Sequence, residues 1–267
     1  MKALTPYHLR ARNHAESSSN KIHDPDYARS LGFAGGIVPG VDVYAYLTRP
    51  VVDFWRLDWL SGGGMDVRFL KPVCDGDLLT IEAQTVGDDQ LELDARKEDG
   101  EVCATGSAKL YPGDDALDLD RYQPAPLPAE PPPADEANFR SRPVLGSLEV
   151  AVSAEESAAQ LREVDEQLEL YARDRIVHPG HLLRFADRIL LENFSLPPWM
   201  HVSSSPRHFA VAHVDEPLSV RANLVDLFER KGHRFVQLDV LILGPSGPVA
   251  RVMPYTAIYR PAFEEKN

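Results

Sequence analysis

Apolar side chains in the first half of the chain predict two helices with different surroundings. Residues 41–47 are apolar on nearly every face, which is typical of a helix buried in a core. A shorter helix is predicted near residues 25–31, because Asp24 is a good N-cap and Pro25 suits a first helical turn. Gly32 would end that helix in the left-handed conformation that glycine adopts easily.

Strand-like runs follow in both halves of the chain. In the first half they are residues 65–70, 78–86, 91–95 and 102–111, with Asp99-Gly100 predicted as a hairpin turn. In the second half a predicted helix over 181–191 precedes strands at 202–211, 217–229, 233–243 and 249–260. One buried helix followed by an antiparallel meander predicts an α+β fold in which a sheet curls around the helix.

The two halves resemble each other at a fixed shift. Residues 77–86 align with residues 216–225, and Ile37-Val38 aligns with Ile176-Val177, both at a shift of 139 positions. Each half also ends in a similar strand. The common order of these matches indicates an internal duplication.

A proline-dense, acidic segment separates the halves. It includes Pro131-Pro132-Pro133 and has no apolar periodicity, so we predict an extended, semi-rigid connector. The predicted organisation is a first domain at residues 1–112, a linker at 113–143 and a second domain at 144–267.

Composition narrows the classes of partner. The chain has 267 residues, of which 43% are hydrophobic, so it is long enough to bury a sizeable core. Its 28 Lys and Arg against 41 Asp and Glu give a net charge of -13. This balance argues against a nucleic-acid partner, because that kind of binding depends on neutralising phosphates with basic side chains.

Cysteine usage and hydropathy predict the compartment. Cys74 and Cys103 lie far apart, without the spacing of a metal site, so we expect buried thiols and neither a disulfide nor a bound metal. No apolar run approaches the roughly 20 residues of a membrane span, and the N-terminus lacks the apolar stretch of a secretion signal. We therefore expect a cytoplasmic protein.

Several ordered motifs carry a resemblance to a known family. They are Asn20-Lys21-Ile22-His23, Gly32-Phe33, Ile37-Val38-Pro39-Gly40 and Arg68-Phe69-Leu70-Lys71-Pro72-Val73. Together they look like the MaoC-like hydratase/dehydratase family, over most of residues 16–111, whereas the second half resembles only the fold. The resemblance implies a double hotdog fold: two antiparallel sheets, each wrapped around a central helix, join edge to edge, and the site lies between them.

The resemblance also implies a reaction. In this chain, however, the motif that performs it is changed at two positions. Members of this family add water to a 2-enoyl thioester, or remove it, using a carboxylate and a histidine. Their motif reads Asp, any residue, Asn, Pro, Ile, His. Here Asn20, Ile22 and His23 match, whereas Lys21 replaces the Pro and Ser18 replaces the Asp. A serine hydroxyl orients water but takes up no proton near neutral pH, so the change leaves the reaction open.

Four residues are candidates for the chemistry. His23 is expected as the general acid/base group, because imidazole titrates near physiological pH. Asn20 would hold a water or the thioester carbonyl, and Ser18 would hold water in place of the missing carboxylate. Asp42 is unusual inside an apolar helix, so it either faces the tunnel as a substitute base or pairs with an arginine.

Four further residues are candidates for binding. The amides of Gly40 and Val41 open the buried helix, where free N–H groups and the helix dipole suit a thioester oxygen. Arg68 and Lys71 are candidates for the phosphates of coenzyme A. The histidines at 178 and 181, in the second half, are expected only as polar residues at a helix start, so one site per chain is predicted.

Three functions stay open on this reasoning. The first is an acyl-CoA hydratase or dehydratase that acts on a 2-enoyl-CoA or a 3-hydroxyacyl-CoA. The second is an acyl-CoA thioesterase, and the third is a non-catalytic acyl-thioester binding protein that has lost the catalytic Asp. None requires a cofactor beyond the coenzyme A of the substrate. The oligomeric state is also open, a homodimer included.

Overall fold

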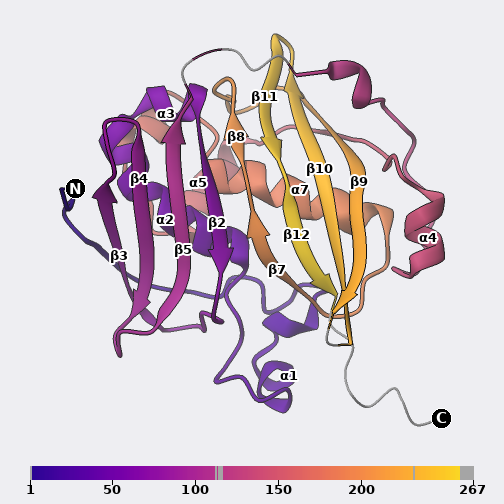
Figure 1. Cartoon of the computed structure of the whole chain (residues 1–267), viewed down its shortest axis with the longest axis horizontal. Coiled ribbons are helices and arrows are strands. Elements are labelled where there is room, and N and C mark those ends of the chain that lie inside the picture. The colour runs from indigo at the N-terminus through magenta and orange to yellow at the C-terminus, as the bar shows by residue number, and fades with distance from the viewer. Residues whose placement is uncertain (1, 112, 114–116, 231, 259–267) are drawn as a thin grey trace.

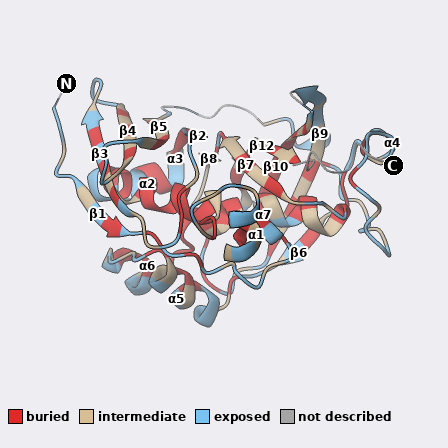
Figure 2. Ribbon diagram, turned by 90° about the horizontal axis from the view of Figure 1, so that it is seen from below, coloured by how far each residue is buried: buried red, intermediate tan, exposed pale blue. Residues whose placement is uncertain are grey.

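The computed structural model describes residues 2–111, 113, 117–230 and 232–258. Its twelve strands form one sheet that curls around two long helices, α2 (Gly40–Trp55) and α7 (Pro179–Asn193). Figure 1 shows the first half of the chain on the left of the sheet and the second half on the right. In Figure 2 the buried α2 and α7 lie inside the arc of the sheet, with smaller helices on its open side.

The first half confirms the predicted order of a short helix, a buried helix and four strands. Its elements are β1 (Tyr7–Arg10), η1 (Lys21–His23), α1 (Pro25–Ser30), α2, α3 (Leu57–Gly62), β2 (Gly63–Phe69), β3 (Leu78–Thr85), β4 (Gln90–Lys97) and β5 (Val102–Leu110). The strand β1 and the helix α3 were not predicted. α1 begins as expected, because the Asp24 carboxylate accepts from the amides of Asp26 and Tyr27.

The second half contains the predicted helix and strands together with additional short elements. They are β6 (Leu148–Val150), α5 (Ala154–Glu163), α6 (Glu169–Arg173), α7, β7 (Trp199–Ser204), β8 (Arg207–His208), β9 (Leu218–Arg230), β10 (His233–Gly244), β11 (Gly247–Val252) and β12 (Pro254–Ile258). The predicted first strand is divided into β7 and β8, and the predicted last strand into β11 and β12. β7 and β8 both pair with β2, and β11 and β12 both pair with β10. Residues 259 and 260 of the last predicted strand lie outside the described residues.

The halves join edge to edge through β2. This strand pairs antiparallel with β5 in its own half and with β7 and β8 in the other half. The joint is short: Val67 lies opposite Ser204, and Gly64 lies opposite Arg207. The first residues of β7 therefore extend past the end of the pairing with β2, toward the loop that carries the Asn-x-Ile-His motif.

The shift of 139 positions recurs in the three-dimensional structure. Ile37 bridges to Cys74 in the first half, and Ile176 bridges to His213 in the second. The start of α2 at residue 40 corresponds to the start of α7 at residue 179. The same shift therefore relates main-chain contacts as well as sequence, which supports the predicted duplication.

The connector packs against the second half. It contains η2 (Leu119–Arg121) and α4 (Glu136–Ser141), which the prediction of a purely extended segment left out. The hydroxyl of buried Tyr122 donates to Asp239 at 2.9 Å, and buried Phe139 packs on Phe194 with ring centroids 4.3 Å apart. These aromatic anchors fix the connector on the side of β9 and β10, away from the joint between the halves.

The core holds both cysteines. Cys74 and Cys103 are buried and free, as predicted, and burial raises the pKa of the Cys103 thiol to about 11. In the part of the chain that the structure describes, no helix has the length and apolar character needed to cross a membrane.

Candidate active site

A cavity of about 310 Å³ lies where the two halves meet. The first half contributes the motif loop, the start of α2 and the end of β2, and the second half contributes α7, β7, β10 and β12. We call it the first cavity. Its wall is mainly apolar, with Val43, Phe69, Val202 and Phe235 among the residues that line it. The polar and charged side chains that line it are Asn20, His23, Lys71, Asp187 and His201.

His23 is held by the one-turn helix η1 and by two main-chain contacts. Its carbonyl accepts from the Asn13 side chain at 2.7 Å, and its Nδ1 lies 2.6 Å from the carbonyl oxygen of Ile37. Because a carbonyl only accepts, Nδ1 carries the proton and Nε2 carries the lone pair. Burial lowers the pKa of His23, so the imidazole is neutral at neutral pH and is a proton acceptor at Nε2.

Asn20 spans the two halves. Its Nδ2 donates to the carbonyl of Trp199 at 2.9 Å, and its Oδ1 accepts from the amide of Trp199 at 3.3 Å. The same Nδ2 lies 3.3 Å from Nε2 of His23. The predicted contact of Asn20 with a thioester or a water is therefore joined by a second role, because this amide also fixes β7 beside the histidine.

The start of α2 faces the first cavity. Asp42 and Val43 donate their amides to Pro39, whereas the amides of Gly40 and Val41 have no acceptor among the described residues. Gly40 lines the cavity, and a Cβ at this position would lie 2.9 Å from Cβ of His201. Glycine is therefore required here by the close approach of β7, and its unpaired amide belongs to a residue that lines the cavity.

A second, more polar cavity of about 380 Å³ adjoins the first. His23, Asn20, Pro39, Asp187 and Trp199 line both. Three other predicted residues, Ser18, Val41 and Asp42, line only the second cavity. The motif histidine therefore lies at the boundary between an apolar and a polar space.

Ser18 and Asp42 are both engaged within the chain. The Ser18 hydroxyl donates to the carbonyl of Asn20 at 3.3 Å. The buried Asp42 carboxylate accepts from Arg184 at 2.7 Å, and Arg184 also binds Glu163 at 3.0 Å. Burial raises the pKa of Asp42, and the guanidinium opposes that rise. Of the two arrangements expected for Asp42, the structure shows the pairing with an arginine.

The two predicted phosphate contacts lie in different places. Lys71 lines the first cavity, is 56% exposed, and lies 3.5 Å from Glu101. Arg68 is exposed on β2 and is absent from the walls of both cavities. Of these two residues, only Lys71 therefore lines the candidate site.

Sequence reasoning missed Asp187, Trp199 and His201, which the second half contributes. Asp187 lies on α7, and its Oδ1 is 3.1 Å from Nδ1 of His201. A signal for Asp187 was present, because it interrupts a predicted apolar helix as Asp42 does. Trp199 and His201 had no such signal, since their place depends on the pairing of strands about 180 residues from the motif.

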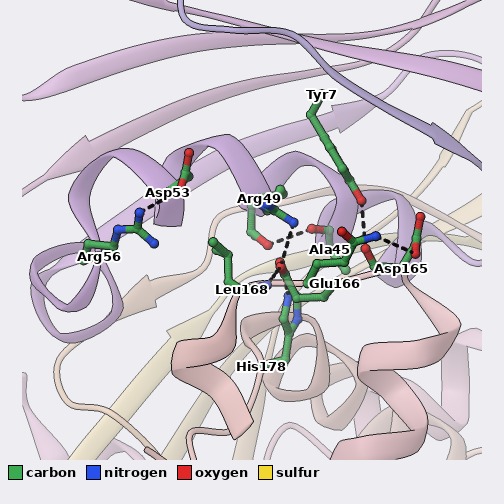
Figure 3. Close-up of polar contacts among 11 residues, drawn as sticks. Tyr7, Ala45, Arg49, Asp53, Arg56, Asp165, Glu166, Leu168 and His178 are labelled. Atoms are coloured by element: carbon green, nitrogen blue, oxygen red, sulfur yellow. Dashed lines mark hydrogen bonds and ion pairs between the residues drawn. The ribbon is translucent and has the colours of Figure 1, made fainter. Parts of the chain in front are cut away.

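The corresponding turn of the second half, at the start of α7, has almost no open space beside it. His178 stands where Pro39 stands in the first half and caps α7, accepting from the amide of Gly180 at 3.0 Å. Buried Glu166 lies 3.7 Å from His178 and binds Arg49 at 3.1 Å (Figure 3). The remaining space beside this turn is about 10 Å³. His178 is thus a helix-start residue, as expected, and the open cavity belongs to the first half's turn.

Comparison with known proteins finds solved structures with a similar architecture. No protein-family model and no curated protein sequence matches the chain. Among solved structures, it is similar to one described as a MaoC-domain dehydratase from Chloroflexus aurantiacus, with 14% identity, a TM-score of 0.65, and 97% of this chain and 94% of the other covered. It is also similar to a double hotdog protein from Mycobacterium tuberculosis, with 17% identity, a TM-score of 0.62, and 97% and 96% covered.

The chain has a double hotdog fold. The predicted fold class is therefore confirmed, and α2 and α7 are its two central helices. The chain is also similar to a structure described as a thioesterase from Thermobifida fusca, with 16% identity, a TM-score of 0.54, and 96% of this chain and 93% of the other covered. Since dehydratases and thioesterases are both among these neighbours, the likeness establishes the double hotdog fold and not the reaction.

Proposed function

We propose that this protein adds water to a 2-enoyl thioester of coenzyme A, or removes water from the matching 3-hydroxyacyl thioester. One observation carries the proposal. The neutral imidazole of His23 and the unpaired amide of Gly40 line the same apolar cavity. A proton acceptor beside an amide that can hold developing negative charge on oxygen is what this addition requires.

The reaction balances with one water and one shuttled proton. As the water oxygen bonds to C3 of the substrate, Nε2 of His23 takes one of its protons. The electron pair of the C2=C3 double bond moves toward the thioester oxygen, where the Gly40 amide stabilises the resulting enolate. His23 then returns the proton to C2, and the second water hydrogen stays on the new hydroxyl. Dehydration follows the same steps in reverse.

The shape of the site fits a substrate with an apolar end and a charged end. The acyl chain is proposed to occupy the first cavity, against Val43, Val202 and Phe235. Lys71, half-exposed beside that cavity, is proposed to meet a phosphate of coenzyme A. Arg68 is left out of this arrangement because it lines neither cavity.

Thioester hydrolysis is the second candidate. The observation that favours it is a carboxylate–imidazole pair in the same cavity, Asp187 with His201. Such a pair would direct a water to the thioester carbon instead of C3. The C–S bond would then break, and free coenzyme A would leave as a thiol.

Two assays separate these reactions. 2-Enoyl-CoAs of short and medium chain length are followed by loss of the conjugated absorbance, and saturated acyl-CoAs by thiol release. We expect absorbance loss in the wild type, with kcat lowered about 10²–10⁴-fold in His23→Ala. His8→Ala, at an exposed histidine on β1, is the matched control and should keep full activity.

Each other result has a defined meaning. Full activity in His23→Ala would remove this residue from the mechanism. Thiol release without absorbance loss would support hydrolysis. Acyl-CoA binding without either signal would support a non-catalytic binding protein, and gain of hydration in Ser18→Asp would then indicate a lost base.

A further inference from the structure

The proposed hydration uses one imidazole, and two carboxylates of the first half that could assist it are engaged in other contacts. Asp24 caps α1 through two amides, and Asp42 is bound to Arg184 at 2.7 Å. Ser18, at the position of the family's carboxylate, lines only the second cavity and donates to a main-chain carbonyl. A carboxylate for this site has to come from elsewhere in the chain.

Asp187 has the required position. Among the described residues that line the first cavity, it is the one acidic side chain, and it lines the second cavity as well. His23 shares both of these walls. The Asp187 side chain is 12% exposed, and its negative charge, like that of Asp42, acts to raise the pKa of His23 against the effect of burial. Cavity lining and electrostatics therefore both place it in the same site as the histidine.

Both oxygens of Asp187 lie near Nδ1 of His201. Oδ2 accepts from this nitrogen at 3.3 Å, and Oδ1, which is shielded from solvent, lies 3.1 Å from it. A carboxylate offers about four lone-pair sites, so the hydrogen bond from His201 leaves capacity to accept from a water molecule in the cavity. The partly exposed carboxylate can therefore bind His201 and a water at the same time.

His201 is itself held in one orientation. Its Nε2 lies 2.6 Å from the hydroxyl of Ser204, while Nδ1 faces the carboxylate. Because the carboxylate only accepts, Nδ1 carries a proton, and the Ser204 hydroxyl fixes the opposite side of the ring. Ser204 is 2% exposed and is absent from the walls of both cavities, so it acts on Asp187 through His201 and not on a substrate.

We propose that Asp187 is the carboxylate of this active site, that it holds the attacking water in the space it shares with His23, and that His201 and Ser204 position it. The inference rests on the proposed hydration. In that reaction the water donates one hydrogen to Asp187 as a hydrogen bond and gives the other to His23 as a proton. The carboxylate also stabilises the imidazolium that exists until C2 receives the proton. The catalytic pair is thus divided between the two halves of the chain.

The test compares Asp187→Asn with Glu192→Gln, an amide substitution on the same helix at a surface carboxylate that binds Arg188. Hydration of a 2-enoyl-CoA is measured as kcat and KM across pH, and folding is checked by the melting temperature. We expect Asp187→Asn to lower kcat about 10²-fold or more, with KM within about threefold of the wild type. Glu192→Gln should leave kcat and KM unchanged.

The pH profile gives a readout that a structural role would not move. Removing the negative charge lowers the pKa of His23 further, so the acidic limb of kcat should move to lower pH in Asp187→Asn. The other charged or titratable groups that line either cavity with His23 are His14, Asp42, Lys71, Glu163, Arg184, Arg188 and His201. All of these are unchanged in both variants, so a shift found only in Asp187→Asn belongs to Asp187.

The outcomes separate this inference from the function it rests on. A wild type without hydration activity would overturn both. An active wild type with unchanged kcat in Asp187→Asn would overturn only the role of Asp187. If Asp187→Asn does not fold, Asp187→Glu decides, because a displaced carboxylate should lower kcat at least about tenfold and an unchanged kcat would reject the role. Ser204→Ala should lower kcat at constant KM, and Ser204→Thr, which keeps the hydroxyl, should restore it.

Discussion

The side chain of Asn20 exchanges two hydrogen bonds with the main chain of Trp199, at 2.9 and 3.3 Å. This contact joins the loop of one half to the first residue of β7 in the other. Since β2 pairs with β7 only at Ser203 and Ser204, Asn20 takes the place of a strand partner beyond the end of β2. The motif asparagine is therefore part of the joint between the halves.

Asn20→Ala should destabilise the fold. It leaves a buried amide and a buried carbonyl of Trp199 without partners, at about 1–3 kcal/mol for each group. We expect the free energy of unfolding in urea to fall by about 2–4 kcal/mol, with reduced activity from the loosened loop. Ser19→Ala, at the exposed neighbouring residue, should change it by less than about 0.5 kcal/mol. Equal stability of the two variants would show that the contact contributes nothing.

Gly40→Ala should disturb the joint between the halves where the start of α2 contacts β7. The added methyl would lie 2.9 Å from Cβ of His201 and 3.3 Å from Phe69, so a strand has to shift. We expect a loss of about 1–3 kcal/mol in unfolding free energy and a lower kcat. The control is Gly35→Ala in the same loop, where a Cβ would meet nothing within 4 Å. A melting temperature of Gly40→Ala equal to that of this control would contradict the prediction.

Arg184→Met should cost more stability than the loss of a surface arginine. It leaves the buried Asp42 carboxylate without its partner, and breaking such a pair typically costs about 3–5 kcal/mol. Burial then raises the pKa of Asp42 unopposed, so the loss should be larger at neutral pH than at pH values where the carboxyl is protonated. Arg188→Met, at a half-exposed arginine paired with Glu192, is the control.

The same pair separates two roles for Asp42. If Asp42 serves only the ion pair, Asp42→Asn combined with Arg184→Met should recover part of the stability lost in Arg184→Met and keep hydration activity. Loss of turnover in a folded Asp42→Asn variant would instead restore the catalytic role expected from the sequence. Urea unfolding and the enoyl-CoA assay on the same samples decide between them.

The fold should lose stability as the solution becomes acidic. Burial lowers the pKa of His181 and of His208 to about 4, below the 6.5 of an unfolded histidine. The unfolded chain therefore binds more protons between these values, and stability is full above pH 6.5 and declines toward pH 4. For buried His208 the loss is on the order of 3 kcal/mol. His208→Phe should flatten the curve of melting temperature against pH, and parallel curves for variant and wild type would refute this account.

The local pattern of apolar residues was enough to predict the helices and strands that bury an apolar face. α2, α7 and the main strands were predicted because their periodicity lies within a few residues of sequence. α5 was missed because its buried residues are Ser157 and Gln160, which give no apolar stripe. Ser153 and Glu156 form a capping box, in which each side chain bonds the other residue's amide. This pair is a sequence signal for a helix start and could have been recognised without an apolar stripe.

The candidate site could be predicted only for the half that carries the motif. His23, Asn20 and Gly40 are close in sequence, and the structure brings them together. Asp187 and His201 belong to the same cavity only because β2 pairs with β7. These strands are so far apart in the sequence that local patterns do not predict their pairing. Arg68 and Lys71 sit close in sequence, yet the pleat and the end of β2 give them different surroundings.

The contrast between the open turn at Gly40 and the closed turn at His178 has a consequence for how such a site evolves. In a symmetric pair of identical halves, every substitution appears at both sites at once, so neither can specialise. A single chain that contains both copies is free of this constraint. Here one copy keeps the motif and an open cavity, whereas the other leaves a space of about 10 Å³ beside its own turn and contributes Asp187 of its helix to the first cavity. The two halves of one chain are thus free to diverge from each other.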